Sequence, residues 1–152
     1  MRVALFQPDI AQNVGSVLRT AACLDCPVDI ILPCGFPFSV KALRRSGMDY
    51  IDKVNYQTHA SWQHFLATTG SNRLVLMTSK CSGSAVTAQF TSNDILLFGR
   101  ESAGAPAYVH DVAALRLRLP MRPDVRSLNL AVSVAMALTL AYTQLNLFEP
   151  LT

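Results

Sequence analysis

The sequence predicts an α/β protein with a mostly parallel sheet and helices on both of its faces. Strand-like apolar runs alternate with segments of helical periodicity along the chain, as they do in parallel sheets joined by helices. The runs are short and almost continuously apolar, which favours strands that are covered on both faces. The 152 residues suffice for one domain with a real core but not for two, so we expect a single domain over residues 1–152.

Strands are expected where β-branched, aromatic or leucine-rich runs lie between turn signals. Residues 73–78 and 95–98 show no polar alternation, whereas residues 115–119 (LRLRL) alternate and predict one solvent-exposed face. In chain order, the expected strands are residues 2–7, 28–32, 50–54, 73–78, 95–98 and 115–119.

Helices are expected where apolar residues recur at helical spacing behind a capping residue. Asn13 is a good N-cap for the first helix, Ser61 for the third, and either Ser127 or Asn129 for the last. The last helix has a broad apolar face and several alanines, which allow close packing against another helix within the chain or in a dimer. In chain order, the expected helices are residues 14–22, 40–46, 62–69, 105–113 and 130–145.

The best candidate site is the loop that follows the strand at residues 95–98. In a parallel sheet the carboxyl ends of the strands share one edge, so this loop is expected beside residues 77–78 and 119–121. Together they offer backbone amides, the carboxylate of Glu101 and apolar side chains, which suits a nucleoside-like ligand. Taken alone, the loop fits an ordinary strand-to-helix turn equally well.

The positive charge of the chain is carried mainly by arginine. Ten of its 13 cationic residues are arginines, and the guanidinium fork suits phosphate, although a net charge of +3 is too mild to prove a nucleic-acid partner. Arg122 and Arg126 are candidate phosphate ligands. Arg44 and Arg45 are further candidates, but their place in the last turn of a short helix is explained equally well by the helix dipole.

Composition argues against several other classes. The chain is 51% hydrophobic and only 15% charged, which favours a second copy covering part of its surface. No apolar run approaches the ~20 residues of a membrane helix, and the start is not a signal peptide, so we expect a cytoplasmic protein. Cys23 and Cys26 close a helix and have no second pair or histidine cluster, so free thiols are expected and no metal.

Four stretches of the chain resemble the SPOUT-superfamily RNA 2′-O-methyltransferases. They are NVGSVLR at residues 13–19, LRRSGMDY at 43–50, FGRESAGAP at 98–106 and PMRPDVRSLNLAVSVAMAL at 120–138. They follow the family's order and span nearly the whole chain, and LRRSGMDY together with RSLN makes the resemblance specific. The chain most resembles the minimal single-domain branch, the tRNA (cytidine/uridine-34)-2′-O-methyltransferases.

This resemblance implies an enzyme that transfers a methyl group from S-adenosylmethionine to the ribose of the wobble nucleotide, position 34, in the tRNA anticodon loop. It also implies a homodimer and a C-terminal trefoil knot, although knots are essentially absent from other folds. By the same resemblance, the methyl donor binds, largely through backbone groups, at Met77, Gly99, Leu119, Met121 and Ser127. The positions that match the family's reacting centre are Asn13, Arg19, Glu101 and Asn129.

The resemblance also frames the expected chemistry. Arginine stays protonated at any relevant pH, so we expect Arg19 to clamp a phosphate and to stabilise the developing alkoxide rather than act as a base. The base is then an RNA phosphate oxygen, water or Glu101. Many relatives have arginine at the position of Ala103 and leucine at the position of Ala105. We therefore expect a local RNA contact and some loop packing to differ from those relatives, but not methyl transfer itself.

Two other classes stay open at this point. One is a catalytically silent RNA-binding module of the same fold, which S-adenosylmethionine binding would distinguish. The other is an ordinary nucleotide- or flavin-binding domain, which the absence of a Walker loop and of G-x-G-x-x-G after a strand disfavours. The sequence GRESAG has one residue too many for the nucleophile elbow of a serine hydrolase.

Overall fold

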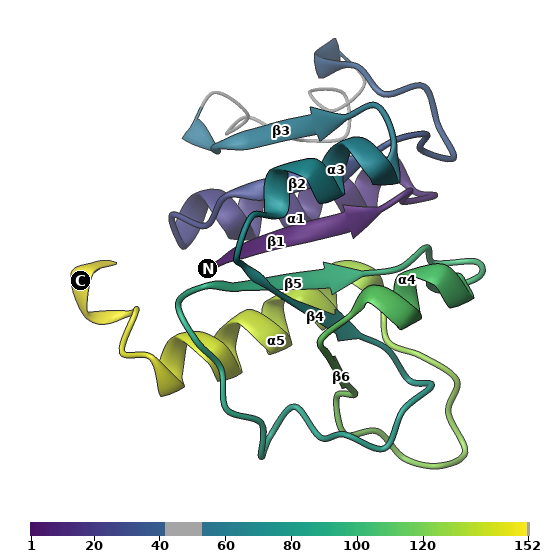
Figure 1. The fold of residues 1–152 in the computed structure, drawn as a ribbon. Helices are drawn as coiled ribbons and strands as arrows, with labels where there is room; N and C mark the ends of the chain where they lie inside the picture. The colour runs from purple at the N-terminus through teal and green to yellow at the C-terminus, as the bar shows by residue number, and fades with distance from the viewer. Residues whose placement is uncertain (42–52, 152) are drawn as a thin grey trace.

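The structure, a computed structural model, describes residues 1–41 and 53–151 (Figure 1). Its centre is a six-stranded sheet in the order β3-β2-β1-β5-β4-β6, and every pairing between these strands is parallel. The strands are β1 (Arg2–Phe6), β2 (Val28–Ile31), β3 (Tyr56–His59), β4 (Arg73–Met77), β5 (Asp94–Phe98) and β6 (Leu115–Leu117). The predicted α/β class with a parallel sheet is therefore confirmed.

Helices cover both faces of the sheet (Figure 1). On one face, α1 and α5 pack against alternate strand residues such as Leu5, Ile30 and Leu96. On the other face, α3 and α4 pack against the residues between them, such as Phe6 and Leu97. This alternation follows from the period of two in a strand, and it gives the sheet an apolar core on each side. The helices are α1 (Ala11–Cys23), α3 (Trp62–Thr69), α4 (Ala107–Val112) and α5 (Leu130–Gln144), and a short 3₁₀ helix, Glu149–Leu151, follows α5.

The caps agree with the sequence at two helices and differ at one. Ser61 caps α3 through a hydrogen bond from His64 N, and Asn129 rather than Ser127 caps α5. The prediction that Asn13 caps α1 is wrong, because the helix begins at Ala11 behind Ile10. Asn13 instead lies inside the first turn, where its side chain contacts two other segments of the chain.

One predicted strand lies elsewhere, and one predicted helix is not described. The third strand is Tyr56–His59, and Val54, at the end of the predicted range 50–54, lies outside any strand. The rest of that range, most of the predicted helix at residues 40–46, and the candidate phosphate ligands Arg44 and Arg45 lie outside the described residues.

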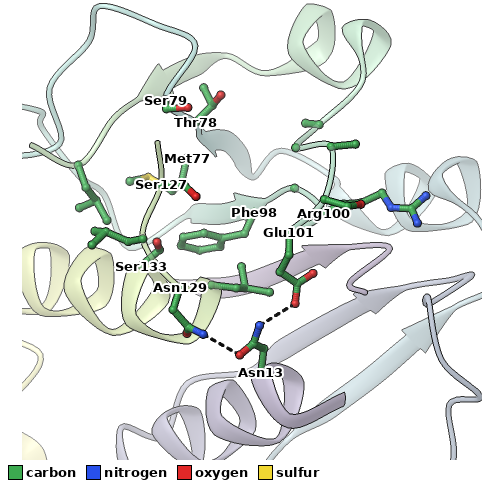
Figure 2. Close-up of a pocket in the computed structure, with 18 of the residues that line it drawn as sticks. Asn13, Met77, Thr78, Ser79, Phe98, Arg100, Glu101, Ser127, Asn129 and Ser133 are labelled. Carbon is green, nitrogen blue, oxygen red and sulfur yellow. Dashed lines mark hydrogen bonds between the residues drawn. The ribbon is translucent and has the colours of Figure 1, made fainter. Parts of the chain in front are cut away.

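The order of the strands indicates where on the sheet a ligand is expected to bind. The chain builds outward from β1 through β2 to β3, then returns to form β4 and β5 on the other side of β1. Ligands of such sheets bind at the carboxyl ends of the strands, where the winding changes direction. At this edge, the ends of β4 and β5 and the starts of α1 and α5 surround a cavity (Figure 2).

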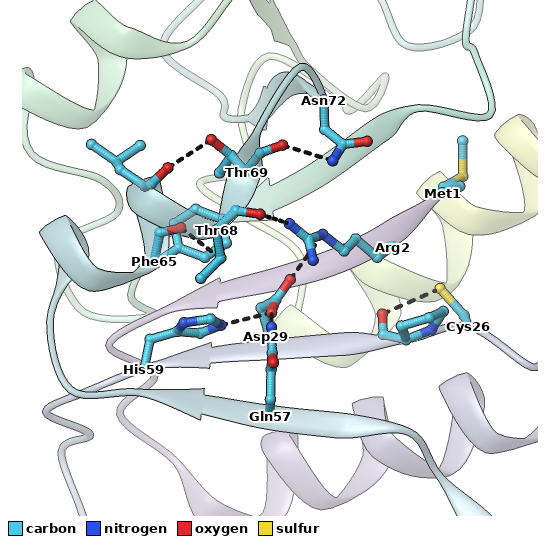
Figure 3. A network of polar contacts seen from close by, with 12 residues as sticks. Met1, Arg2, Cys26, Asp29, Gln57, His59, Phe65, Thr68, Thr69 and Asn72 are labelled. Atoms are coloured by element: carbon cyan, nitrogen blue, oxygen red, sulfur yellow. Dashed lines mark hydrogen bonds and ion pairs between the residues drawn. The ribbon is translucent and has the colours of Figure 1, made fainter.

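A charged network away from that cavity holds α3 to the sheet (Figure 3). Asp29 is buried in β2 and accepts a hydrogen bond from Gln57 Nε2 at 2.7 Å, and His59 Nε2 lies 2.7 Å from its carboxylate. Arg2 Nε forms an ion pair with Asp29 at 3.1 Å, and Arg2 Nη2 donates to the carbonyl of Thr68 in α3. A buried carboxylate requires such partners.

Removing the cation of this network is expected to destabilise the fold. Arg2→Ala leaves the Asp29 carboxylate buried without its cationic partner, and we expect a loss of about 2 kcal/mol in unfolding free energy. This is less than the ~3–5 kcal/mol of a fully buried pair, because the Arg2 side chain is 22% exposed. Urea denaturation measures the loss. Arg116→Ala, on the exposed face of β6, is the control and should change stability by less than about 0.5 kcal/mol.

Candidate active site

The cavity at the carboxyl edge has a volume of about 580 Å³. Its apolar wall includes Met77, Phe98, Leu119 and Leu130, and its polar wall comes from the loops that follow β4 and β5 and from the start of α5 (Figure 2). The volume lies in the ~300–1,000 Å³ range of small-ligand sites. A mixed wall of this kind can hold an apolar ring system while backbone and amide groups orient it.

Gly99 shapes the loop that closes the cavity beside β5. A Cβ atom at this position would lie 2.4 Å from Ala105 N and 2.4 Å from the carbonyl carbon of Gly104, which is too close for any real contact. The loop folds back on itself because Arg100 N donates to Gly104 O at 3.1 Å and Gly104 N donates to Arg100 O at 2.8 Å. Gly104 has a φ of 70°, a conformation that favours glycine. Position 99 therefore requires glycine.

A chain of side-chain hydrogen bonds joins three separate segments at the cavity (Figure 2). Asn13 Nδ2 in α1 donates to Glu101 Oε1 at 3.0 Å, and Asn129 Nδ2 donates to Asn13 Oδ1 at 2.9 Å. Asn129 Oδ1 also accepts from the backbone N–H groups of Ala131 and Val132, and so caps α5. The amide of Asn13 is thus fixed between the carboxylate of Glu101 and the first turn of α5.

Asp9 anchors the loop that carries Glu101. Its carboxylate accepts hydrogen bonds from Arg100 Nη2 at 2.7 Å and from Ser102 Oγ at 2.6 Å, while its own backbone N–H donates to Glu101 Oε2 at 2.7 Å. Burial by itself raises the pKa of Asp9, but the hydrogen bonds from Arg100 and Ser102 and the charge of Arg100 outweigh it and hold the pKa at about 2. Asp9 is therefore ionised throughout the neutral range.

This anchor is expected to weaken in acid. A carboxylate whose pKa is lower in the folded state stabilises the fold above its unfolded value, near 3.8, and loses that contribution as the pH falls toward 2. Wild type should therefore be more stable than Asp9→Asn at pH 6, and the difference should shrink between pH 4 and pH 2. Urea midpoints measured across this range test it, and a difference that does not vary with pH contradicts it.

Cys34 lies close to these carboxylates. Its half-buried position, together with the negative charges of Glu101 and Asp9, raises the pKa of its thiol to about 11. The thiol stays protonated at neutral pH and cannot act as a nucleophile there. Cys26 is buried, and burial raises its pKa, while Cys23 is exposed. All four cysteines are free.

Most of the residues expected to form the site come together. The lining of the cavity includes Asn13, Met77, Gly99, Glu101, Leu119, Met121, Ser127 and Asn129. Arg19 is exposed on α1 and does not line this cavity, and it lies six residues, or about 9 Å along the helix axis, beyond Asn13. Arg122 and Arg126 line a second, smaller hollow that adjoins the cavity.

The sequence analysis missed Asp9. An acidic residue in a loop carries no periodic signal, and its partners Arg100 and Ser102 are more than 90 residues away. Thr78, at the end of the strand predicted over residues 73–78, was expected at this edge and lines the cavity, as do Ser79 and Lys80. Ser79 and Lys80 directly follow that predicted strand, a position that could have identified them individually.

Metal-binding groups and membrane-spanning helices were sought in the part of the chain that the structure describes, residues 1–41 and 53–151. In these ranges, no group of three or more histidine, cysteine or acidic side chains is placed to hold a metal ion. In the same ranges, the helices are too short or too polar to cross a membrane.

Comparisons with known proteins agree with the geometry. A curated protein of Beijerinckia indica, named tRNA (cytidine(34)-2′-O)-methyltransferase, is 49% identical over 145 residues, which cover 93% of this chain and 90% of that protein. A protein of Escherichia coli K12 with the same name is 33% identical over 147 residues, which cover 95% of this chain and 94% of that protein.

Solved structures give the same result. A solved structure from work on the 2-OH methylation of C/U34 on tRNA matches this chain with a TM-score of 0.90 and 41% identity, over 95% of each chain. An AdoMet-bound rRNA methyltransferase from Sinorhizobium meliloti matches with a TM-score of 0.83 and 25% identity, over 95% of this chain and 56% of that one. The sequence model of the SpoU rRNA methylase family matches residues 1–139. This chain therefore belongs to the SpoU rRNA methylase family, which confirms the SPOUT resemblance of its sequence.

Proposed function

We propose that this protein methylates the ribose 2′-hydroxyl of the wobble nucleotide, position 34, in tRNA, with S-adenosylmethionine as the methyl donor. The observation that carries the proposal is the single cavity onto which the predicted donor-binding positions and the chain Glu101–Asn13–Asn129 converge. The names and high coverage of the relatives support the substrate and favour an enzyme over a silent RNA-binding module.

The cavity suits the proposed donor in size and chemistry. Its apolar wall can cover an adenine ring, and the loop of residues 99–104, which folds back on itself, contributes main chain to the wall. We assign the binding of the donor to Met77, Gly99, Leu119, Met121 and Ser127, all of which line the cavity. When bound, S-adenosylmethionine would supply an activated methyl group on a sulfonium.

The chain's own side chains would orient the acceptor and handle its proton. A ribose hydroxyl is a weak nucleophile, and precise positioning can supply several kcal/mol toward its reaction. Glu101 is held by the N–H of Asp9 and the amide of Asn13, and its carboxylate keeps lone pairs for one more donor. We propose that Glu101 accepts a hydrogen bond from the 2′-hydroxyl and that Asn13 and Asn129 fix the orientation of the Glu101 carboxylate.

Arg19 is proposed to clamp an RNA phosphate. Arg19→Lys keeps the charge but loses the planar fork, so kcat/KM for tRNA should fall by about ten- to a hundredfold, in line with the ~1.5–3 kcal/mol of a charged hydrogen bond. The dependence of the rate on pH should not change. Methyl-transfer assays across pH test both points, and a retained rate with a lost pH dependence would contradict the clamp.

A second copy of the chain is proposed to cover the outer face of α5. The first half of this helix exposes two large apolar side chains, Val132 and Met136, which lie one turn apart and are 46% and 37% exposed. Neighbouring exposed apolar side chains are typical of protein–protein contacts, which supports a homodimer through this face. Analytical ultracentrifugation of wild type and of Met136→Glu tests it, because a charge at a buried interface should shift the equilibrium to monomer.

The remaining parts of the proposal follow the family. We expect one catalytic domain over residues 1–152, a C-terminal trefoil knot and a cytoplasmic location. The knot is supported by the loops after β4, β5 and β6, which all line one cavity. Arg44, Arg45, Arg122 and Arg126 are the proposed contacts with the tRNA backbone in the anticodon loop.

Nucleoside mass spectrometry of tRNA from cells with and without the gene tests the proposed function. A 2′-O-methylated cytidine or uridine at position 34 should disappear without the gene and return with a wild-type copy. Purified protein should also methylate tRNA from the deleted strain. Unchanged methylation at position 34 would overturn the proposal.

A further inference from the structure

A second hollow of about 180 Å³ lies beside the cavity and shares part of its wall. The two have Ser79, Leu119 and Met121 in common. The smaller hollow is too small for a nucleoside in the ~300–1,000 Å³ range of such sites but is large enough for a single oxyanion. A ligand that occupies the cavity can therefore place a small charged group in the adjoining hollow.

The smaller hollow is strongly basic. Three arginines, Arg118, Arg122 and Arg126, line it, and none of its lining residues is acidic. Arg122 is paired with Asp124, through Nη2 at 2.8 Å and Nε at 3.1 Å. In the described part of the chain, neither Arg118 nor Arg126 has a side-chain hydrogen bond or ion pair. Two guanidinium groups thus remain available for an anion.

The backbone holds Arg118 in place. Its N–H donates to Gly83 O at 2.8 Å, and its carbonyl accepts from Ala85 N at 2.9 Å, so both of its backbone groups pair with the loop after β4. Gly83 cannot be larger, because a Cβ there would lie 2.5 Å from the carbonyl oxygen of Arg116. The backbone of Arg118 is therefore fixed before binding, which lowers the conformational entropy lost when its guanidinium group binds an anion.

We propose that Arg118, with Arg126, forms a phosphate subsite that holds the RNA strand at the nucleotide being methylated. This proposal rests on the proposed function. A 2′-hydroxyl and the 3′-phosphate of the same nucleotide sit on neighbouring ribose carbons, so an enzyme that acts on the hydroxyl must accommodate that phosphate nearby. Two guanidinium forks bind phosphate in a defined geometry, which positions the strand without reading its sequence.

The test compares two arginines of the same segment. Arg118→Gln removes the charge from the hollow, while Arg116→Gln removes an exposed charge two residues away that does not line it. The substrate is tRNA from cells that lack the gene. Affinity is measured over a salt series, and calorimetry measures S-adenosylmethionine binding to each variant. Thermal unfolding verifies that both variants fold.

The expected result is specific to Arg118. Arg118→Gln should weaken tRNA binding by about tenfold and reduce the slope of log affinity against log salt by about one unit, with donor affinity unchanged. Arg116→Gln should change none of these values by more than about twofold. A conservative Arg118→Lys should restore the salt slope but only part of the affinity, because lysine keeps the charge and loses the fork.

Three results would overturn the subsite. If Arg118→Gln weakens donor binding and leaves tRNA binding intact, the hollow holds the donor's carboxylate. If both variants weaken tRNA binding equally, the effect is a diffuse field, and if neither does, the hollow is not an anion site. In each of these cases, methylation of position 34 by the wild-type protein would leave the proposed function standing, and only the subsite would be wrong.

Discussion

Replacing Gly99 with alanine is expected to abolish binding of the methyl donor. The added Cβ would meet the backbone of Gly104 and Ala105 at 2.4 Å, and backbone atoms cannot move aside as a flexible side chain can. The loop at residues 99–104 must therefore shift, and it forms one wall of the cavity. We expect S-adenosylmethionine affinity to fall by more than about a hundredfold, or ~3 kcal/mol, measured by calorimetry.

A second glycine separates this local effect from a general loss of stability. Gly70 ends α3 with a φ of 54° and has open space where a Cβ would lie. Gly70→Ala should cost about 1 kcal/mol of stability through its left-handed backbone and should leave donor binding unchanged. Retained donor binding in a folded Gly99→Ala variant would show that this loop does not contact the donor.

The strands and most helices could be predicted because their signals are local. Burial on both faces gives β4 and β5 continuous apolar runs, and Ser61 and Asn129 are capping residues that do cap. β3 was missed because it is an edge strand, YQTH, with polar exposed residues in its middle and no apolar run. The sequence contains no signal of comparable strength at that position.

The site could be predicted in part, for a different reason. Glycine and carboxylate after a buried strand are visible in the sequence, so Gly99 and Glu101 were identified correctly as cavity residues. Asn13 looked like a helix cap because asparagine favours that position, but its amide is committed to Glu101 and Asn129 instead. Local rules fail most often at functional sites, and this exception lies in the cavity itself. The role of Asp9 depends on contacts that only the folded chain creates.

Replacing Glu101 with glutamine is expected to lower kcat by about a hundredfold or more. Both carboxylate oxygens accept hydrogen bonds, one from Asp9 N at 2.7 Å and one from Asn13 Nδ2 at 3.0 Å. A glutamine amide has a single oxygen, so its NH₂ group must face one of these donors. The substitution also removes the charge that can take a proton, an effect worth ~10²–10⁴ in rate for a general base. Single-turnover methylation of tRNA measures the change.

A double-mutant cycle shows whether Glu101 and Asn13 act as one unit. Asn13→Ala alone should also lower kcat, because Glu101 then loses a donor and Asn129 loses its acceptor. If the two side chains work together, the double variant should be little slower than Glu101→Gln alone, because the shared function is already lost. Rate losses that multiply would mean that they act independently. That result would remove Asn13 as the group that orients the carboxylate and would leave Asp9 as its anchor.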